Sequence, residues 1–456
     1  MNQAVKQNKM GVQPINKLLL SMSLPIMVSM IIQALYNIVD SIFVSKISET
    51  AFTAVSLAFP VQNLIIALGA GTGVGINALL SKSLGERNFD QANKAARTGV
   101  FLSFINFAIF VLFGLFFAET FMSAQTSNAE IIQYGTGYLK ICTLFSIGIF
   151  GQITTERLLQ ATGKTVYSMY TQGAGAIINI ILDPVLIFGI GPFPKMEVAG
   201  AAAATVIGQL SAFALGLFLN VKINKEININ MKGFRPDFNV IKKIYVVGIP
   251  SIIMQSITSV MTFSMNKILS NYSDTAQAVM GAYFKLQSFV FMPVFGLNNG
   301  LIPILSFNYG ARKRKRMIDT IKYGCIYATV IMIAGTVLMQ TIPGTLLKMF
   351  DASEDMMSMG IVALRIISLS FVMAGIDIIF CSSLQALGHS LYSMFISITR
   401  QLLVLLPVAF AIAKLTHYSN VDYVWWTFLI SEVVSLVCSA VFMKIVNKNV
   451  ISKVEN

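Results

Sequence analysis

The chain has 456 residues, of which 55% are hydrophobic and only 12% are charged. Soluble domains carry about 25% charged residues, so the composition excludes an ordinary soluble fold and indicates a polytopic membrane protein. A net charge of +13 could suggest a nucleic-acid partner. The basic residues lie in short segments between apolar runs, however, where membrane topology explains them and no nucleic acid is expected. None of the four cysteines forms a CxxC pair, so neither a zinc site nor a disulfide framework is predicted.

Residues 1–17 are polar and lack the pattern of a signal peptide. Apolar windows long enough to cross a bilayer then recur along the chain. We expect an all-α membrane protein of twelve spans, at about 18–43, 53–80, 98–118, 131–155, 166–190, 198–220, 244–268, 278–307, 321–342, 357–387, 391–413 and 423–446.

Lysine and arginine set the orientation. If the N-terminus is cytoplasmic, the inside segments hold 24 of the 33 basic residues. This bias predicts a multi-pass protein of the cell membrane with both termini in the cytoplasm. The run from Arg312 to Arg316 could also bind anionic lipid, but a topology anchor is the simpler interpretation.

The two halves of the chain resemble each other at an offset of 225 residues. Pro25 then matches Pro250, and Leu159-Gln-Ala-Thr-Gly163 matches Leu384-Gln-Ala-Leu-Gly388. Agreement at one offset indicates an internal repeat, and six spans per unit make the repeats parallel. We predict an N-lobe at 1–220, a cytoplasmic linker at 221–243 and a C-lobe at 244–456, with a central cleft between the lobes.

Two carboxylates of the first half lie in predicted spans. In the fifth span, Asn179 and Asp183 are four residues apart and share a helix face, and Pro184 removes a backbone donor beside the acid. An aspartate at mid-membrane costs about 2.5–3.5 kcal/mol, which indicates a functional site. The first span carries Asp40 at the end of a polar stripe. An Asp40 hydrated near the headgroups is the alternative.

Two such carboxylates close together cannot easily both ionise, so the pair could hold a proton. Alternatively, Asp40, Asn179 and Asp183 could bind Na⁺, with Thr205 of the sixth span as a hydroxyl ligand. The residue pattern leaves proton and sodium both open. No resident cofactor is expected.

The second half has no matching acids, because Met265 and Val408 stand at the positions of Asp40 and Asp183. Asp377 in the tenth span is a third buried acid, which could act in function or pair with a neighbouring helix. The polar candidates for a substrate cleft are Gln33, Tyr36, Asn37, Gln255, Gln287 and Asp377.

Four other charged residues have simpler explanations. Glu156 and Arg157 are expected to form a surface pair, and Arg400 is expected to snorkel toward water. Lys285 could form a salt bridge across the cleft. The run Gly69-Ala-Gly-Thr-Gly-Val-Gly75 lies in a span without a preceding strand, so it predicts close helix packing and not a phosphate loop.

Three features of the chain resemble those of one known family: the two parallel six-span repeats, Ser23-Leu-Pro25 and Asn179-x3-Asp183-Pro184. In these features the chain is similar to the multidrug and toxic compound extrusion (MATE) transporters, and to their DinF-like branch in particular. The resemblance implies cation-coupled drug export. It also implies an N-lobe cation site at Asp40, Asn179, Asp183 and Thr205. The chain departs from another branch, which has a glutamate in the seventh span, so a C-lobe site built on that glutamate is not expected.

We therefore expect an antiporter that exports amphipathic, often cationic compounds in exchange for Na⁺ or H⁺, with Pro25 and Pro184 as hinges and a monomer in the bilayer. A flippase for lipids or lipid-linked saccharides is the alternative, and more basic residues would be expected in its cleft. A membrane enzyme would need a catalytic constellation, and none is found in the sequence. A structural scaffold would leave the repeat and the buried acids unexplained.

Overall fold

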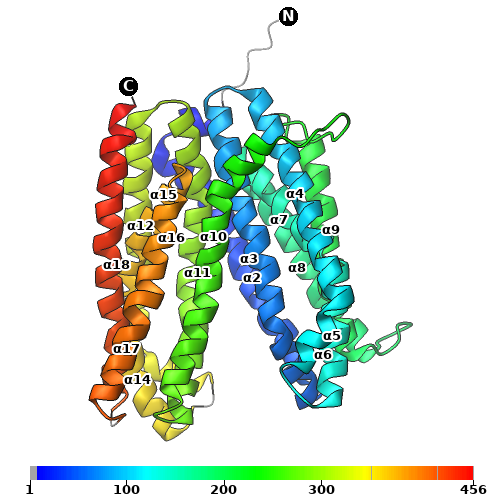
Figure 1. Cartoon of the computed structure of the whole chain (residues 1–456), viewed down its shortest axis with the longest axis vertical. Coiled ribbons are helices and arrows are strands. Elements are labelled where there is room, and N and C mark those ends of the chain that lie inside the picture. Colours follow the sequence, from blue (N-terminus) through cyan, green and yellow to red (C-terminus); the bar gives the residue numbers. More distant parts are fainter. Residues whose placement is uncertain (1–7, 351, 419, 455–456) are drawn as a thin grey trace, which may run out of the picture. The chain divides into compact units, whose positions relative to one another are not determined.

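The computed structural model describes residues 8–350, 352–418 and 420–454. No strand occurs in these residues, and Figure 1 shows the helices coloured in chain order. The helices are α1 (Lys9–Val12), α2 (Ile15–Ser45), α3 (Glu49–Gly85), α4 (Phe89–Phe116), α5 (Ala118–Ser123), α6 (Ala129–Leu144), α7 (Ile147–Ala161), α8 (Thr165–Phe188), α9 (Glu197–Lys222), α10 (Phe238–Leu269), α11 (Asp274–Gly310), α12 (Arg314–Thr341), α13 (Pro343–Lys348), α14 (Glu354–Ser368), α15 (Phe371–Ala386), α16 (Ser390–Ile398), the π-helix η1 (Thr399–Leu405), α17 (Leu406–Leu415), α18 (Asp422–Asn449) and the 3-10 turn η2 (Ile451–Lys453).

Ten helices of the described chain are long and apolar enough to cross a membrane. Two further spans are bent helix pairs: α6 and α7 meet at 45°, and α14 and α15 meet at 47°. The predicted all-α fold with up to twelve spans is thereby confirmed. Both bends fall at matching places of the repeat, because the 225-residue offset brings the end of α6 beside the end of α14.

The internal repeat is also visible in local geometry. The Ser81 hydroxyl donates to the Ala161 carbonyl at 3.0 Å, and Ser306 donates to Ala386, 225 residues later, at 2.8 Å. Arg87 and Arg312 both adopt a left-handed backbone, with φ of 57° and 54°. They follow α3 and α11, where a left-handed residue ends the helix. Equivalent sequences therefore form equivalent hydrogen bonds and turns.

The described chain divides into two compact units. Unit 1 contains Asn8 and 28–252, and unit 2 contains 9–27 and 253–454. Two helices change unit along their length. The first part of α2 belongs to unit 2 and the rest to unit 1, whereas α10 begins in unit 1 and continues in unit 2. The units therefore do not coincide with the two sequence repeats.

The glycine run of α3 packs on two faces within unit 1. A Cβ atom on Gly69 would meet the Ile153 side chain of α7 at 2.9 Å. A Cβ on Gly75 would lie 2.2 Å from the Ile244 carbonyl oxygen of α10. Glycines four residues apart face the same neighbour, so Gly71 joins Gly75 against α10. The close helix packing predicted for this run is present, and it brings the beginning of α10 against α3.

Within unit 1, α9 packs against α8 and α7, and α3 packs against α4, α6 and α7. The core between these helices includes Val61, Leu139, Phe150 and Ala202, which are all buried. Large apolar side chains on the outer faces of long helices are exposed, as at Phe116. Exposed apolar surface of this kind on spanning helices is suited to lipid contact.

Candidate functional site

The polar centre of unit 1 depends on a close approach of α8 and α9. A Cβ on Gly208 of α9 would lie 2.7 Å from the Gly175 carbonyl oxygen of α8, and a Cβ on Gly175 would lie 2.9 Å from that of Gly208. Only glycine fits at such a crossing. The next turn of α8 carries Asn179, which this crossing brings beside Thr205 of α9.

Asn179, Asp183 and Thr205 form one hydrogen-bonded cluster. The Asn179 amide nitrogen, Nδ2, donates to Asp183 Oδ1 and to Thr205 Oγ1, each at 3.3 Å. Asp183 is fully buried and Asn179 is nearly so. Both side chains project from a continuous helix, because α8 runs through Pro184 to Phe188.

Unpartnered oxygens point to a cation at this cluster. Asp183 Oδ2, Asn179 Oδ1 and Asp40 Oδ1 are buried and accept no hydrogen bond. Buried acceptors without a donor are costly, so such a group of oxygens is suited to hold either a proton or a hard cation such as Na⁺. Asp40 lies on the part of α2 that belongs to unit 1, and its carboxylate interacts electrostatically with that of Asp183.

The stripe on α2 continues from Asp40 toward the beginning of that helix. Gln33 hydrogen-bonds with Tyr36 and also accepts a bond at 3.0 Å from Gln172 Nε2 of α8. Asn37, between Tyr36 and Asp40 in sequence, shares this helix face by its spacing but is exposed. Gln33 and Tyr36 therefore belong to the polar network of unit 1, whereas Asn37 makes no contact in that network that the structure records.

Glu156 was expected to form a surface pair with Arg157, and this expectation is wrong. Glu156 is only 9% exposed. Its Oε1 accepts hydrogen bonds from Gln152 Nε2 at 3.0 Å and from Thr171 Oγ1 at 3.4 Å. Arg157 turns instead across Gly73 of α3, and its Nη1 donates to Gln160. Glu156 is thus, with Asp183, a buried carboxylate of unit 1.

Unit 2 contains a different arrangement of charges. Arg400 Nη1 lies 3.6 Å from Asp377 Oδ2 and 3.4 Å from Glu432 Oε1, and Ser435 Oγ donates to Asp377 at 2.9 Å. These residues come from η1, α15 and α18. The snorkelling expected for Arg400 is therefore wrong, because two buried acids hold its side chain within the bundle. Asp377 pairs with a neighbouring helix, one of the two possibilities left open by the sequence.

The remaining candidates of unit 2 are less constrained. Gln255 and Gln287 are half-buried on α10 and α11. The Lys285 ammonium group, for which a salt bridge was considered, lies 5.8 Å from the centre of the Phe350 ring, a cation–π distance. Pro25 lies inside the continuous helix α2, and Pro184 inside α8.

A transition-metal site is not supported. Among residues 8–350, 352–418 and 420–454, no group of three or more His, Cys, Asp or Glu side chains could hold a metal ion. Asn179, Asp183 and Thr205 instead form a mixed amide, carboxylate and hydroxyl cluster, and oxygen donors of these kinds suit Na⁺.

Parallel six-span repeats with buried carboxylates are the architecture of secondary transporters. The family model MatE matches residues 25–185 and 250–411. The chain therefore belongs to the MatE family of membrane transporters and is not an enzyme.

Relatives named as multidrug export proteins support the same family. The chain is 27% identical to the multidrug export protein MepA of Staphylococcus haemolyticus (strain JCSC1435), covering 92% of this chain and 91% of the relative. It is 26% identical, with the same coverage, to MepA of Staphylococcus aureus (strain MSSA476).

Solved structures show the same fold. A MOP superfamily transporter from Pyrococcus furiosus Vc1 superposes with a TM-score of 0.91 at 23% identity, covering 100% of both chains. A multidrug resistance MATE family transporter in an outward-facing conformation superposes with a TM-score of 0.92 at 22% identity, covering 99% of this chain and 100% of the other.

Proposed function

We propose that this transporter exports amphipathic, often cationic compounds from the cell in exchange for Na⁺ or H⁺, by alternating access. The observation that carries the proposal is the buried cluster of Asn179, Asp183 and Thr205 beside Asp40, with its unpartnered oxygens. The family and the relatives named as multidrug export proteins favour drug export over lipid flipping.

Coupling follows from the electrical work of export. A monovalent cation that leaves a negative-inside cell works against about 2.3 kcal/mol per 100 mV, so another ion must enter in exchange. A proton or Na⁺ bound at Asp40 and Asp183 removes the repulsion between the two carboxylates. This change alters how α2 packs beside α8, with Pro25 and Pro184 as the hinges, and it shifts the equilibrium between inward- and outward-open states.

Gln33 and Tyr36 in unit 1 and Gln255, Gln287 and Asp377 in unit 2 are the proposed polar contacts of the exported compound. Asn37, which is exposed, is proposed as a further contact of the exported compound. Both termini are proposed to be cytoplasmic, because 24 of 33 basic residues fall on that side. The transporter is proposed to work as a monomer.

Dye efflux from proteoliposomes with imposed Na⁺ or H⁺ gradients tests the proposal and identifies the ion. Asp40→Asn and Asp183→Asn should each abolish gradient-driven efflux. Asp274→Asn, an exposed acid in the first turn of α11, is the matched control and should keep it. Wild-type efflux in both site variants would exclude the cluster as the coupling site.

A further inference from the structure

Glu156 has no role in the proposed ion exchange at Asp40 and Asp183, although a buried carboxylate in a spanning helix is costly to keep. We propose that Glu156 is a proton-relay residue, which carries protons between the Asp40–Asp183 site and the water at the α7–α8 end of unit 1. The inference rests on the proposed function, with H⁺ as the coupling ion.

Tyr36 links Glu156 to the ion site. Thr171 of α8, the residue before Gln172, donates to Glu156 Oε1 at 3.4 Å. Tyr36 lies on α2 one turn before Asp40. It also hydrogen-bonds with Gln33, which joins α2 to Gln172 of α8. A phenol hydroxyl can accept one proton while it donates its own, so it can pass a proton without a lasting charge.

The surroundings of Glu156 suit a group that changes protonation. Its Oε1 accepts one amide and one hydroxyl hydrogen bond, from Gln152 and Thr171, so the ionised form is not left without donors. Arg157 also acts on it electrostatically, while the Arg157 side chain is held at Gln160. Glu156 therefore has two hydrogen-bond donors for its charged form.

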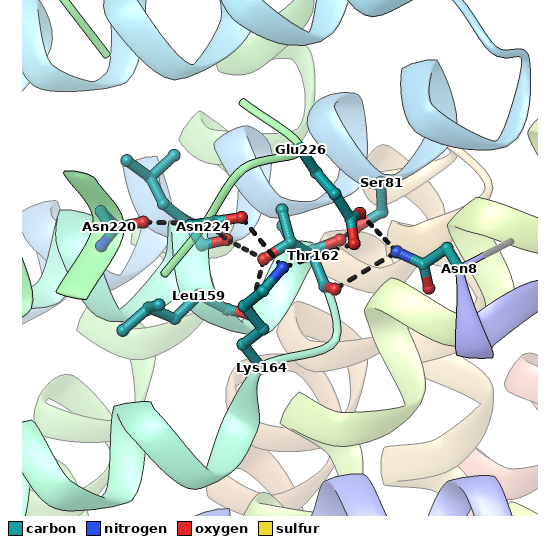
Figure 2. A network of polar contacts seen from close by, with 10 residues as sticks. Asn8, Ser81, Leu159, Thr162, Lys164, Asn220, Asn224 and Glu226 are labelled. Carbon is teal, nitrogen blue, oxygen red and sulfur yellow. Dashed lines mark hydrogen bonds and ion pairs between the residues drawn. The ribbon is translucent and has the colours of Figure 1, made fainter. Parts of the chain in front are cut away.

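Beyond Glu156, polar groups continue to the surface. Asn220 Nδ2 donates to the backbone carbonyl of Thr155, the residue before Glu156, at 2.9 Å. Asn224 donates to Asn220 at 3.1 Å, and Lys164 Nζ donates to Asn224 at 3.2 Å. Figure 2 shows Asn220, Asn224 and Lys164 in this network.

The network ends at a partly exposed ion pair. Lys164 Nζ lies 3.3 Å from Glu226 Oε1, and their side chains are 20% and 33% exposed. Asn8 donates to the other oxygen of Glu226 and, at 3.3 Å, to the Thr162 carbonyl (Figure 2). This end of unit 1 therefore meets water beside a polar column that begins next to Glu156.

The relay step transfers one proton and needs no other reactant. The carboxyl group of Asp40 or Asp183 gives its proton to the Tyr36 hydroxyl oxygen. The Tyr36 hydroxyl gives its own proton to the Glu156 carboxylate at the same time, and Glu156 becomes a neutral carboxylic acid. Glu156 then releases its proton to water at the α7–α8 end and returns to the carboxylate. The amide groups of Gln33 and Gln172, which bond directly to each other, do not themselves ionise.

Substrate-driven H⁺ flux in proteoliposomes, measured with a pH-sensitive dye, tests the relay. Glu156→Gln should slow H⁺ flux by at least about 100-fold, the lower end of the range for a lost acid–base group. The affinity of the Glu156→Gln variant for the fluorescent substrate, measured by direct binding, should stay near that of the wild type. Added azide, a small diffusible proton carrier, should restore part of the flux, and Glu156→Asp should keep more flux than Glu156→Gln.

Glu119→Gln, an exposed acid on α5, is the matched control and should behave as wild type. Thr171→Val removes one donor to Glu156 with little change of shape. It should slow H⁺ flux severalfold, and it keeps the inference testable if Glu156→Gln does not fold.

The outcomes separate the two proposals. If Asp183→Asn abolishes H⁺ flux while Glu156→Gln and Thr171→Val keep it, the relay is wrong and the proposed function stands. Loss of substrate binding in Glu156→Gln with no azide rescue also overturns the relay, because Glu156 is then structural. Wild-type exchange with Na⁺ alone, and no H⁺ flux, rejects proton coupling and the relay together.

Discussion

Gly75→Ala tests whether the α3–α10 crossing in unit 1 is as close as the structure has it. The new Cβ would lie 2.2 Å from the Ile244 carbonyl oxygen, whereas ordinary van der Waals contact begins at 3.4 Å. The obstructing atom is backbone, so no side chain can rotate away. The first part of α10 must instead move back by about 1.2 Å or lose part of its packing, which typically costs about 1–3 kcal/mol.

The higher helix propensity of alanine offsets part of that cost, by up to about 1 kcal/mol. We expect a net loss of about 1–2 kcal/mol and a melting temperature lower by about 2–8 °C, using the scale for domains of 150–250 residues. Size-exclusion chromatography of the detergent-solubilised protein after heating measures the shift.

Gly173→Ala in α8 is the matched control, because a Cβ there meets nothing within 4 Å. It should leave the melting temperature unchanged or raise it slightly, since only the helix propensity changes. If both variants melt like the wild type, α3 and α10 are not packed through Gly75, and the assignment of residues up to 252 to unit 1 loses its support.

Three further predictions concern an ion pair, a turn and a histidine of unit 2, and the turn is compared with its equivalent in unit 1. Arg400→Gln leaves the carboxylates of Asp377 and Glu432 without their base and should destabilise the protein by about 3–5 kcal/mol, measured by size-exclusion chromatography after heating. Adding Asp377→Asn should recover part of the loss, and no recovery would argue against the ion pair. Gly388→Ala, at φ of 83°, should cost about 1–2 kcal/mol, and Gly163→Ala, at φ of 82°, should cost as much; an unstrained Gly388→Ala would contradict the left-handed turn. Burial lowers the pKa of His389 below its ordinary 6.5, so as the pH falls the unfolded chain takes up this proton before the folded protein does. The stability that neutral His389 contributes at neutral pH is therefore lost as the pH falls below 6.5. His389→Gln should flatten this part of the pH dependence of the melting temperature, and an unchanged slope would exclude the role of His389.

The fold was largely predictable because its signals are local or periodic. Apolar windows identified the spans, and the 225-residue offset identified equivalent turns such as those at Gly163 and Gly388. The change of unit within α2 and α10 was not predictable. It depends on which distant surface a helix face meets, and both halves of each helix are similarly apolar. The bends after α6 and α14 also lie in continuous apolar sequence, so hydropathy alone shows one span at each.

The candidate site was predictable in part. The four-residue spacing of Asn179 and Asp183 placed them on one face, and the structure joins them to Thr205. Glu156 was missed because an acid followed by an arginine near a helix end resembles a surface pair. The repeat offered a signal, since the equivalent of Glu156 is Cys381, a residue type that is usually buried. Arg400 was missed because its partners Asp377 and Glu432 are far away in sequence.

The exchange of helix segments between units has a consequence for synthesis. Unit 1 lacks the α10 segment that packs against Gly71 and Gly75 of α3 until the ribosome has made the chain as far as residue 252. The first part of α2 is made at the start but cannot reach its final packing until α11 has been made. Met27 and Ser23 of α2 pack against Gly296 and Gly300 of α11. Neither unit can therefore reach its final packing from one half of the gene product alone. The two halves, expressed as separate polypeptides cut within the 221–243 segment, should assemble only when they are made together in one membrane.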